Sequence, residues 1–551
     1  MVAHLNYCIT GHCMNSGASD VRHPKARPLI ISLAACSAYV VLLCIFFDPR
    51  WETNDDVAMS MVAHGYGLAA YGSPQIVFSN VIWGVIVRTV PSIGGVFGYS
   101  LAMLGAITLA ASAILYFLVR LGAGYAVGLL VVALILLRPV LQAQFTVTAG
   151  LLTAAAVLGV CVYHRTGSTF SLVASAVLAL LGFLVRNLEF AVVALVALPI
   201  LPWGMLWKDR KLQVAAAALV SGMVGVTWID QFAYSGSEWN YFWELNLARA
   251  PFTDFGVAGR LLEAPEIMAR HGMSRNDVEL LKHYFFADRQ LADPARLRAV
   301  LADLAPVAVK SYSFESGLDS LRSIFDSRIL APLVAAMVLL LLAFERRTIV
   351  SWIISVAVIF ALGMAGRHGI LRVYIPMFML LLFIPFLSGR LTSGGRKAAM
   401  LVVLVIACLV NAKVLIAESR ANSRDIAAAT VLGPVPAEPV VVWGGAFPFE
   451  ISFPLFPGQS NSRNLKMFGL GVFTWAPFSV AVAEENAGRG LVSRLRSGEG
   501  ILLVADAEQK ELLSPYCAEH FGGQLKLEEK TTMLTTILKV TCVEAATKQA
   551  N

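Results

Sequence analysis

One polar stretch near the start of the chain organises the rest of the sequence: Phe47-Asp48-Pro49-Arg50-Trp51-Glu52-Thr53-Asn54-Asp55-Asp56-Val57-Ala58-Met59. It follows the first long apolar run and leads into Gly65-Tyr66-Gly67 and then Pro74-Gln75-Ile76-Val77-Phe78-Ser79-Asn80. Adjacent carboxylates such as Asp55 and Asp56 are costly to hold at the mouth of a membrane bundle. We therefore expect this acidic pair to have a use there.

The composition is that of a membrane protein. Of the 551 residues, 57% are hydrophobic and only 14% are charged, whereas soluble globular proteins carry about 25% charged residues. The formal net charge is +7, which a multi-span protein gathers when Lys and Arg concentrate in its cytoplasmic loops. The charge is therefore no evidence for nucleic acid, and we expect membrane lipids as partners.

Apolar runs near the ~20 residues that cross a bilayer predict about eleven membrane spans. Their approximate ranges are 29–47, 99–119, 125–142, 145–163, 169–185, 190–207, 212–232, 329–344, 349–365, 373–389 and 398–416. The apolar region 76–93 is interrupted by Arg88 and closed by Pro91. We expect an interfacial or re-entrant segment there, because a full span would invert every later loop.

Basic residues in alternate loops predict the orientation of the chain. With the N-terminus inside, the short inner loops carry basic residues at Arg120, His164-Arg165, Lys208-Asp209-Arg210-Lys211, Glu345-Arg346-Arg347 and Arg390 to Lys397. This pattern satisfies the positive-inside rule. We predict a multi-pass protein with a cytoplasmic N-terminus and an extracytoplasmic C-terminus.

This orientation divides the chain into three predicted parts. Residues 1–28 form a cytoplasmic tail, 29–416 form a transmembrane domain with outer loops at 48–98 and 233–328, and 417–551 form an extracytoplasmic α/β domain. The fold class is thus mainly α, a polytopic helical bundle with a small C-terminal α/β domain. In the tail, His4, Cys8, His12 and Cys13 fit no closed zinc pattern, and we expect disorder.

Local signals give the elements of the outer parts. Ser274 and the pair Asp293-Pro294 resemble helix starts in the second outer loop. In the C-terminal part we expect strands at 440–443 and 500–506, a helix at about 507–521, and strands at 524–529 and near 533–543. Cys517 and Cys542 could pair if this part lies in an oxidising compartment, which the sequence leaves open.

Charged residues at the outer ends of spans are the second informative feature. They are Arg138, Arg186, Glu189, Arg367, His368 and Arg372. The positive-inside rule disfavours arginine on this side. Salt bridges within the protein or snorkelling to headgroups are one interpretation. A phosphate-bearing ligand is the other, since guanidinium groups bind phosphate oxygens in a bidentate way.

The order of these features resembles the GT-C fold glycosyltransferases, multi-span enzymes of bacterial envelopes and the endoplasmic reticulum. The resemblance rests on a first span followed by an outer loop with Asn54-Asp55-Asp56, a Gly-rich stretch and Phe78-Ser79-Asn80. It extends more loosely to Arg372-Val373-Tyr374-Ile375-Pro376, and a soluble tail also fits the family. The resemblance implies a bacterial inner-membrane enzyme of envelope polysaccharide biogenesis. Such an enzyme transfers a sugar from a polyprenyl-phosphate-linked donor to a glycan or lipid-linked acceptor.

The resemblance also implies roles for residues. The family's first-loop aspartate, the general base, maps onto Asp55 or Asp56, and we favour Asp55. A positioned carboxylate can take the proton of an attacking hydroxyl, and cationic groups stabilise the leaving lipid phosphate. For the donor phosphate we expect the cationic group Arg367, His368, Arg372, Arg186 and Arg138. For substrate contacts we expect Glu189, Asn80 and Tyr374.

The sequence also bears on cofactors and on functions that compete with glycosyl transfer. Some relatives bind a divalent metal through the acidic loop, but we expect no cofactor, since no second carboxylate cluster is evident on the outer side. A glycan ligase or polymerase would use the outward Arg and His residues instead of an Asp base. A transporter or flippase would need charges at mid-span and matched broken helices. A membrane acyltransferase would need a catalytic histidine, for which His368 is the outer candidate.

Overall fold

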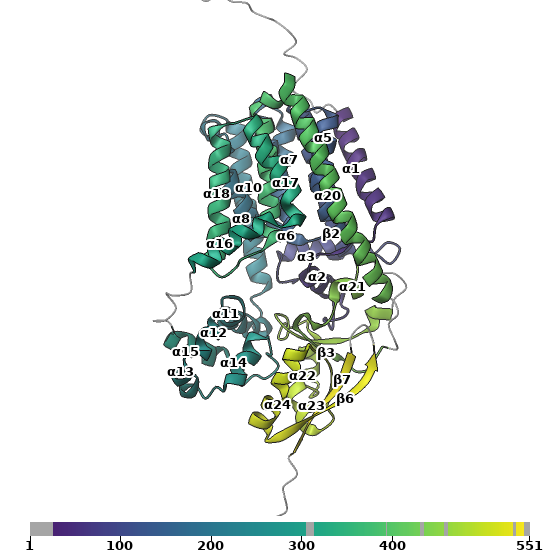
Figure 1. Ribbon diagram of the computed structural model, residues 1–551, viewed down its shortest axis with the longest axis vertical. Coiled ribbons are helices and arrows are strands. Elements are labelled where there is room, and N and C mark those ends of the chain that lie inside the picture. Colours follow the sequence, from purple (N-terminus) through teal and green to yellow (C-terminus); the bar gives the residue numbers. More distant parts are fainter. Residues whose placement is uncertain are drawn as a thin grey trace, which may run out of the picture.

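The computed structural model describes residues 26–304, 313–392, 394–429, 435–456, 461–532 and 536–544. The N-terminal tail with its His and Cys residues lies outside these ranges. Figure 1 shows a helical bundle with a smaller body at one end, made of short helices and a β-sheet. The fold class expected from the sequence is confirmed.

Eleven helices of the described chain correspond to the eleven predicted spans. They are α1 (Ala26–Phe46), α4 (Gly98–Arg120), α5 (Tyr125–Leu141), α6 (Phe145–Thr166), α7 (Thr169–Val185), α8 (Asn187–Ala197), α10 (Arg210–Ala233), α17 (Ser327–Leu342), α18 (Arg346–Met364), α19 (Leu371–Phe383) and α20 (Gly394–Ala429). By length and composition, seven helices of the described ranges can cross a membrane, or up to eight if the bent pair formed by residues 314–325 and 327–342 is one span. Three shorter apolar helices complete the set, and the number of crossings stays a prediction.

Helix α6 forms the centre of the bundle. Within its most apolar 18-residue window, 94% of the residues are buried, and its sequence is rich in small residues that let neighbouring helices approach closely. A Cβ atom at Gly159 would lie 2.2 Å from Oγ of Ser175 on α7. A Cβ atom at Gly182 on α7 would lie 2.7 Å from Oγ1 of Thr153 on α6. These two glycines therefore set the close packing of α6 against α7.

The first outer loop folds into short elements beneath the bundle (Figure 1). Strand β1 (Arg50–Trp51) pairs in parallel with β2 (Gln142–Ala143), and helices α2 (Asn54–His64) and α3 (Val81–Thr89) follow in the loop. Helix α3 has nine residues, which rise about 13 Å and so cannot cross a core of about 30 Å. This agrees with the interfacial or re-entrant segment expected at 76–93.

The second outer loop forms short helices, most of which lie beside the sheet domain, whereas the last one packs against α18 of the bundle (Figure 1). These short helices are α11 (Asn240–Asp254), α12 (Val257–Leu262), α13 (Pro265–Arg270), α14 (Arg275–Lys282), α15 (Pro294–Leu304) and α16 (Phe314–Arg322). Both predicted helix starts are confirmed. Ser274 and Asp277 form a reciprocal capping box on α14, and Pro294 is the first residue of α15. Residues 305–312 lie outside the described ranges.

The C-terminal domain contains a mixed five-stranded sheet in the order β4-β3-β5-β7-β6. Its strands are β3 (Val440–Trp443), β4 (Met467–Leu470), β5 (Ile501–Val504), β6 (Gly523–Thr532) and β7 (Thr536–Glu544). Its helices are α21 (Phe449–Ser452), α22 (Val480–Asn486), α23 (Leu491–Ser497) and α24 (Ala507–Phe521). Strands β4, β3 and β5 are parallel, whereas β7 is antiparallel to both β5 and β6.

Most of this domain agrees with the sequence-based expectation. The predicted helix and four predicted strands correspond to α24, β3, β5, β6 and β7, and Cys517 of α24 forms a disulfide with Cys542 of β7. Strand β4 was not predicted, because Met467-Phe468-Gly469-Leu470 is short and contains a glycine, which weakens a strand pattern. Strand β4 lies at one edge of the sheet and pairs in parallel with β3, so the missed strand belongs to the parallel part of the sheet.

Candidate functional site

Helix α2 places the two aspartates in different surroundings. Thr53 is extended and α2 begins at Asn54, so Asp55 and Asp56 both lie in the first turn, where the helix dipole favours negative charge. Successive helical residues point about 100° apart. The side chain of Asp55 is 28% exposed, whereas Asp56 is 0% exposed.

Asp56 is held by the bundle. Its Oδ1 atom accepts hydrogen bonds from the Tyr99 hydroxyl at 3.0 Å and from the Phe145 backbone N–H at 3.1 Å. Burial, followed by the neighbouring charge of Asp55, raises the pKa of Asp56 well above its ordinary value. Asp56 therefore joins α2 to the starts of α4 and α6 and has no exposed surface for a substrate.

Asp55 lies beside a group of arginines. Its Oδ2 atom is 3.2 Å from a guanidinium nitrogen of Arg372, at the start of α19. Arg186, between α7 and α8, donates to the Phe78 carbonyl at 2.9 Å and lies 5.1 Å from the centre of the Phe145 ring. The charges of Asp55, Arg372 and Arg367 all act on Arg186. Of the predicted phosphate-binding residues, Arg372 thus contacts Asp55, and Arg186 lies within range of the charges of Asp55, Arg372 and Arg367.

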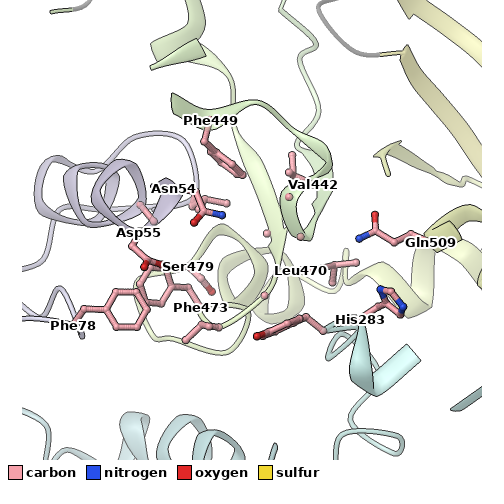
Figure 2. A pocket seen from close by; sticks show the side chains of 18 of the residues that line it. Asn54, Asp55, Phe78, His283, Val442, Phe449, Leu470, Phe473, Ser479 and Gln509 are labelled. Carbon is pink, nitrogen blue, oxygen red and sulfur yellow. The ribbon is translucent and has the colours of Figure 1, made fainter. Parts of the chain in front are cut away.

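A cavity of about 430 Å³ opens from Asp55 into the soluble body. Its volume is within the range of about 300–1,000 Å³ that is usual for small-ligand sites. Figure 2 shows Asn54, Asp55 and Phe78 on one side and His283 and Gln509 on the other. The lining therefore comes from the first outer loop, the second outer loop and the C-terminal domain. The lining residues are Asn54, Asp55, Ala58, Leu68, Phe78, Lys282, His283, Tyr284, Val442, Gly444, Gly445, Phe449, Gly469, Leu470, Gly471, Val472, Phe473, Ser479 and Gln509.

Arg138 and Glu189 do not line this cavity. A guanidinium nitrogen of Arg138 is 2.6 Å from Oε1 of Glu52, and the Arg138 side chain is only 6% exposed. This ion pair ties the last turn of α5 to the residue that follows β1. Glu189 is 2% exposed and lies near Gly150 of α6. Its position is inside the bundle, between α6 and α8.

The other predicted site residues also lie outside the cavity lining. Asn80 caps α3 by accepting from the Ile82 N–H, and its amide donates to the Val226 carbonyl at 3.0 Å. The hydroxyls of Tyr374 and Ser320 are 2.6 Å apart, and both residues are fully buried. His368 is exposed in the segment between α18 and α19, next to Arg367, whose guanidinium lies 5.5 Å from the centre of the Phe255 ring.

The C-terminal domain contributes residues to the site that were not predicted from the sequence. Glu450 of α21 interacts with the backbone N–H of Asn54, and burial is the first cause that raises the pKa of its carboxyl. Gly444 and Gly445 follow β3, and Gln509 lies in the first turn of α24 after β5. The carboxyl ends of parallel strands are the usual ligand-binding edge of such a sheet. That rule is the signal that could have found this edge from the predicted strands.

One metal-compatible cluster occurs among the described residues, away from the acidic loop. Asp277, Glu519 and His520 offer ligand atoms that lie within 4.8 Å of one another. Asp277 already accepts from the Ser274 backbone N–H, and its other oxygen is 2.8 Å from Nε2 of His520. Hydrogen bonding within the protein accounts for this arrangement. Independence from metal stays a prediction.

Comparisons with known proteins add a structural resemblance. Neither the scan against protein-family models nor the search of curated proteins gives a match. Among solved structures, the chain is similar to ArnT from Cupriavidus metallidurans in the apo state, with 13% identity and a TM-score of 0.38. It is also similar to the same protein bound to undecaprenyl phosphate, with 11% identity and a TM-score of 0.38. Both alignments cover 94% of this chain and 98% of the other.

The likeness covers most of both chains but is weak. At this low identity and TM-score it carries no argument about activity, which rests on the residues of the site.

Proposed function

We propose that the protein is an inverting membrane glycosyltransferase of the GT-C type that uses a polyprenyl-phosphate-linked sugar as donor. One observation carries the proposal: the partly exposed carboxylate of Asp55 both contacts Arg372 and lines an open cavity. A carboxylate that adjoins a phosphate-binding group and a cavity for a hydroxyl-bearing ligand can serve as the general base of glycosyl transfer.

The reaction needs a base and cationic groups from the protein. Asp55 accepts the proton of an acceptor hydroxyl as its oxygen attacks the anomeric carbon of the donor sugar. The bond between that carbon and the lipid phosphate breaks, and the electron pair leaves with the phosphate. Arg372, with Arg186 and Arg367 nearby, neutralises the negative charge that develops on the leaving group. A single displacement inverts the anomeric configuration.

The remaining residues support this arrangement. Asp56 fixes α2 through its hydrogen bonds to Tyr99 and Phe145, so that Asp55 keeps its direction. His368 lies beside Arg367 and is exposed, where it can meet the lipid phosphate. Arg138 is engaged by Glu52, so its part is to hold the first outer loop against the bundle.

The site belongs at the outer face of a bacterial inner membrane. Basic residues concentrate in the loops at the other end of the bundle, and the positive-inside rule assigns that end to the cytoplasm. The acceptor is then a glycan or lipid-linked glycan of the cell envelope. The alternative functions are a ligase or polymerase that relies on Arg and His, and a lipid transporter.

The test is an assay of the purified protein in liposomes with sugars attached to undecaprenyl phosphate and a mixture of envelope glycolipids. We expect free undecaprenyl phosphate and a new glycoside of inverted configuration to appear in equal amounts. Matched reactions with nucleotide-linked sugars should give no product. Movement of the donor across the bilayer without formation of a glycoside would contradict the proposal and favour the transporter.

A further inference from the structure

The far side of the cavity is the carboxyl edge of the parallel strands. Strand β3 ends at Trp443 and continues into Gly444-Gly445, and β4 ends at Leu470 and continues into Gly471. Strands β4 and β5 pair with opposite edges of β3, so the chain reverses its winding at β3. Crevices outside the carboxyl ends of strands at such a reversal are the usual binding sites of open α/β sheets.

Two glycines keep this edge open. A Cβ atom added at Gly445 or at Gly471 would meet no atom within 4 Å, although both residues line the cavity. The turn at Gly471 is fixed by Thr474, whose hydroxyl oxygen accepts from the Gly471 N–H at 2.9 Å. The open space is therefore bounded by ordered backbone, and a larger side chain there would project into it.

The lining at this edge suits an uncharged polar ligand. Phe78, Phe449 and Phe473 supply aromatic surface, while Asn54 supplies an amide group and Gln509 supplies its Nε2 group, since its Oε1 accepts from the Asp506 N–H. Aromatic surface with a few placed polar groups is the usual lining of a small-ligand site. Such a lining fits a sugar ring, which presents both C–H faces and hydroxyls.

Charge at the same edge disfavours phosphate. Lys282 and His283 of the lining already have acidic neighbours, since Lys282 is 3.0 Å from Glu279 and His283 is 3.3 Å from Glu508. The start of α24, where an anion would otherwise be favoured, is occupied by Asp506. Its carboxylate accepts from the Gln509 backbone N–H at 2.9 Å. Nucleotides and sugar phosphates are therefore poor candidates for this edge.

The arginines near Asp55 are not part of the cavity lining. Arg372, Arg186 and Arg367 are absent from the cavity lining, whereas Asp55 belongs to it and also contacts Arg372. If the donor phosphate lies with the arginines, the cavity remains for the molecule that brings the hydroxyl. This step rests on the proposed function.

We propose that the carboxyl edge of β3 and β4, with Phe449, Phe473 and Gln509, is a binding site for an uncharged sugar of the acceptor. The acceptor sugar lies with its reacting hydroxyl toward Asp55. The C-terminal domain therefore selects the acceptor, while the membrane bundle binds the donor.

The test uses the full chain in detergent. Larger side chains are introduced at the two lining glycines, so that they occupy the open part of the cavity. The variants are Gly445→Leu and Gly471→Leu, and Gly259→Leu is the matched control. Gly259 lies on the exposed surface of α12, outside the cavity, and a Cβ there also meets no atom within 4 Å. None of these three glycines has a positive φ, so none of the substitutions strains the backbone.

Binding is measured by saturation-transfer NMR with a panel of neutral methyl mono- and disaccharides, and separately with undecaprenyl phosphate. We expect at least one neutral glycoside to bind the wild type and Gly259→Leu. Its signal should fall at least tenfold in Gly445→Leu and in Gly471→Leu. Binding of undecaprenyl phosphate should be unchanged in all four proteins.

Several results would overturn the inference. These are a wild type that binds no neutral glycoside, a bound glycoside whose signal survives in both cavity variants, and displacement of the glycoside by millimolar inorganic phosphate. Because this readout needs no transfer, it separates the inference from the proposed function. A chain that binds glycosides at this edge but forms no glycosidic bond would refute the proposed reaction and leave the sugar site in place.

Discussion

At the residue scale, the two aspartates of α2 differ although they are neighbours in the sequence. No local signal separates Asp55 from Asp56, because both stand in the first turn of one helix. The difference arises from groups far along the chain, Tyr99 and Phe145 at Asp56 and Arg372 at Asp55. The different surroundings of the two aspartates could therefore not be predicted from the sequence, and the role of the pair stays a prediction.

For the arginines too, the sequence predicts the charged residues but not the partner of each one. Of the five cationic residues predicted for the donor phosphate, Arg372 contacts Asp55, and Arg186 lies near enough for the charge of Asp55 to act on it. The structure places Arg138 in a buried ion pair with Glu52. A charge at the outer end of a span indicates that some partner exists, but the partner follows only from the packing of the helices.

Arg372 offers the sharpest substitution among the arginines. In Arg372→Gln we expect transfer to fall about 10²–10³-fold, the usual loss when one preorganised donor to a developing charge is removed. Arg372→Lys should recover only part of this, since an ammonium group cannot form a bidentate pair with phosphate. Initial rates and affinity for undecaprenyl phosphate in the same preparations check the prediction.

The matched control is Arg322→Gln. Arg322 of α16 also pairs with an aspartate, Asp319, at 2.8 Å, but its side chain is 77% exposed. Normal transfer is expected from this variant. Equal losses in Arg372→Gln and Arg322→Gln would argue that removal of any outer arginine impairs the protein nonspecifically.

At the element scale, apolar length was enough to find the helices of the bundle, and capping signals found α14 and α15. Short elements without a strong period were harder. Strand β4 has four residues including Gly469, and α21 has four residues. Both line or support the candidate site. Strand β4 forms by pairing within the sheet, and α21 packs against α2. Such contacts between distant segments leave no local pattern in the sequence.

The end of α2 gives a pH-dependent prediction. Nε2 of His64 accepts a hydrogen bond from the Tyr99 backbone N–H at 3.1 Å, which joins the last turn of α2 to the start of α4. Burial, with the charges of Arg88 and Arg463, lowers the pKa of His64 to about 4. The folded state thus binds this proton less readily than the unfolded state, where the pKa is near 6.5.

The sign of the effect follows from linkage. The contribution of His64 to stability is fully present above pH 6.5 and is lost as the pH falls toward 4. We expect the melting temperature of the wild type to fall over this window more steeply than that of His64→Gln, which keeps an acceptor but does not titrate. Thermal unfolding in detergent between pH 4 and 7.5 checks this. Parallel curves for the two proteins would refute it.

At the scale of the whole molecule, the candidate site joins segments that are far apart in the sequence. Asp55 follows the first span, His283 belongs to the second outer loop, and Gly471 and Gln509 come from the C-terminal domain. The orientation of loops could predict that these segments share one side of the membrane. Their meeting in a single cavity depends on how the C-terminal sheet docks under the bundle (Figure 1).

The contact between the C-terminal domain and the bundle also joins the proposed acceptor site to the proposed donor site. Glu450 of the C-terminal domain interacts with the Asn54 backbone at the start of α2, next to Asp55. The bundle and the soluble domain thus both define the position of the proposed base. Donor and acceptor would meet where these two parts meet.

The central claim is that Asp55 is the base of sugar transfer at this boundary. The most direct measurement is transfer of labelled sugar from undecaprenyl-phosphate-linked donor by Asp55→Asn, with binding of undecaprenyl phosphate measured on the same folded protein. The account predicts that transfer falls by at least about 10²-fold, the lower range for loss of a general base, while the lipid still binds. Transfer at the wild-type rate by Asp55→Asn would contradict the account and favour a reaction that relies on the arginines and His368.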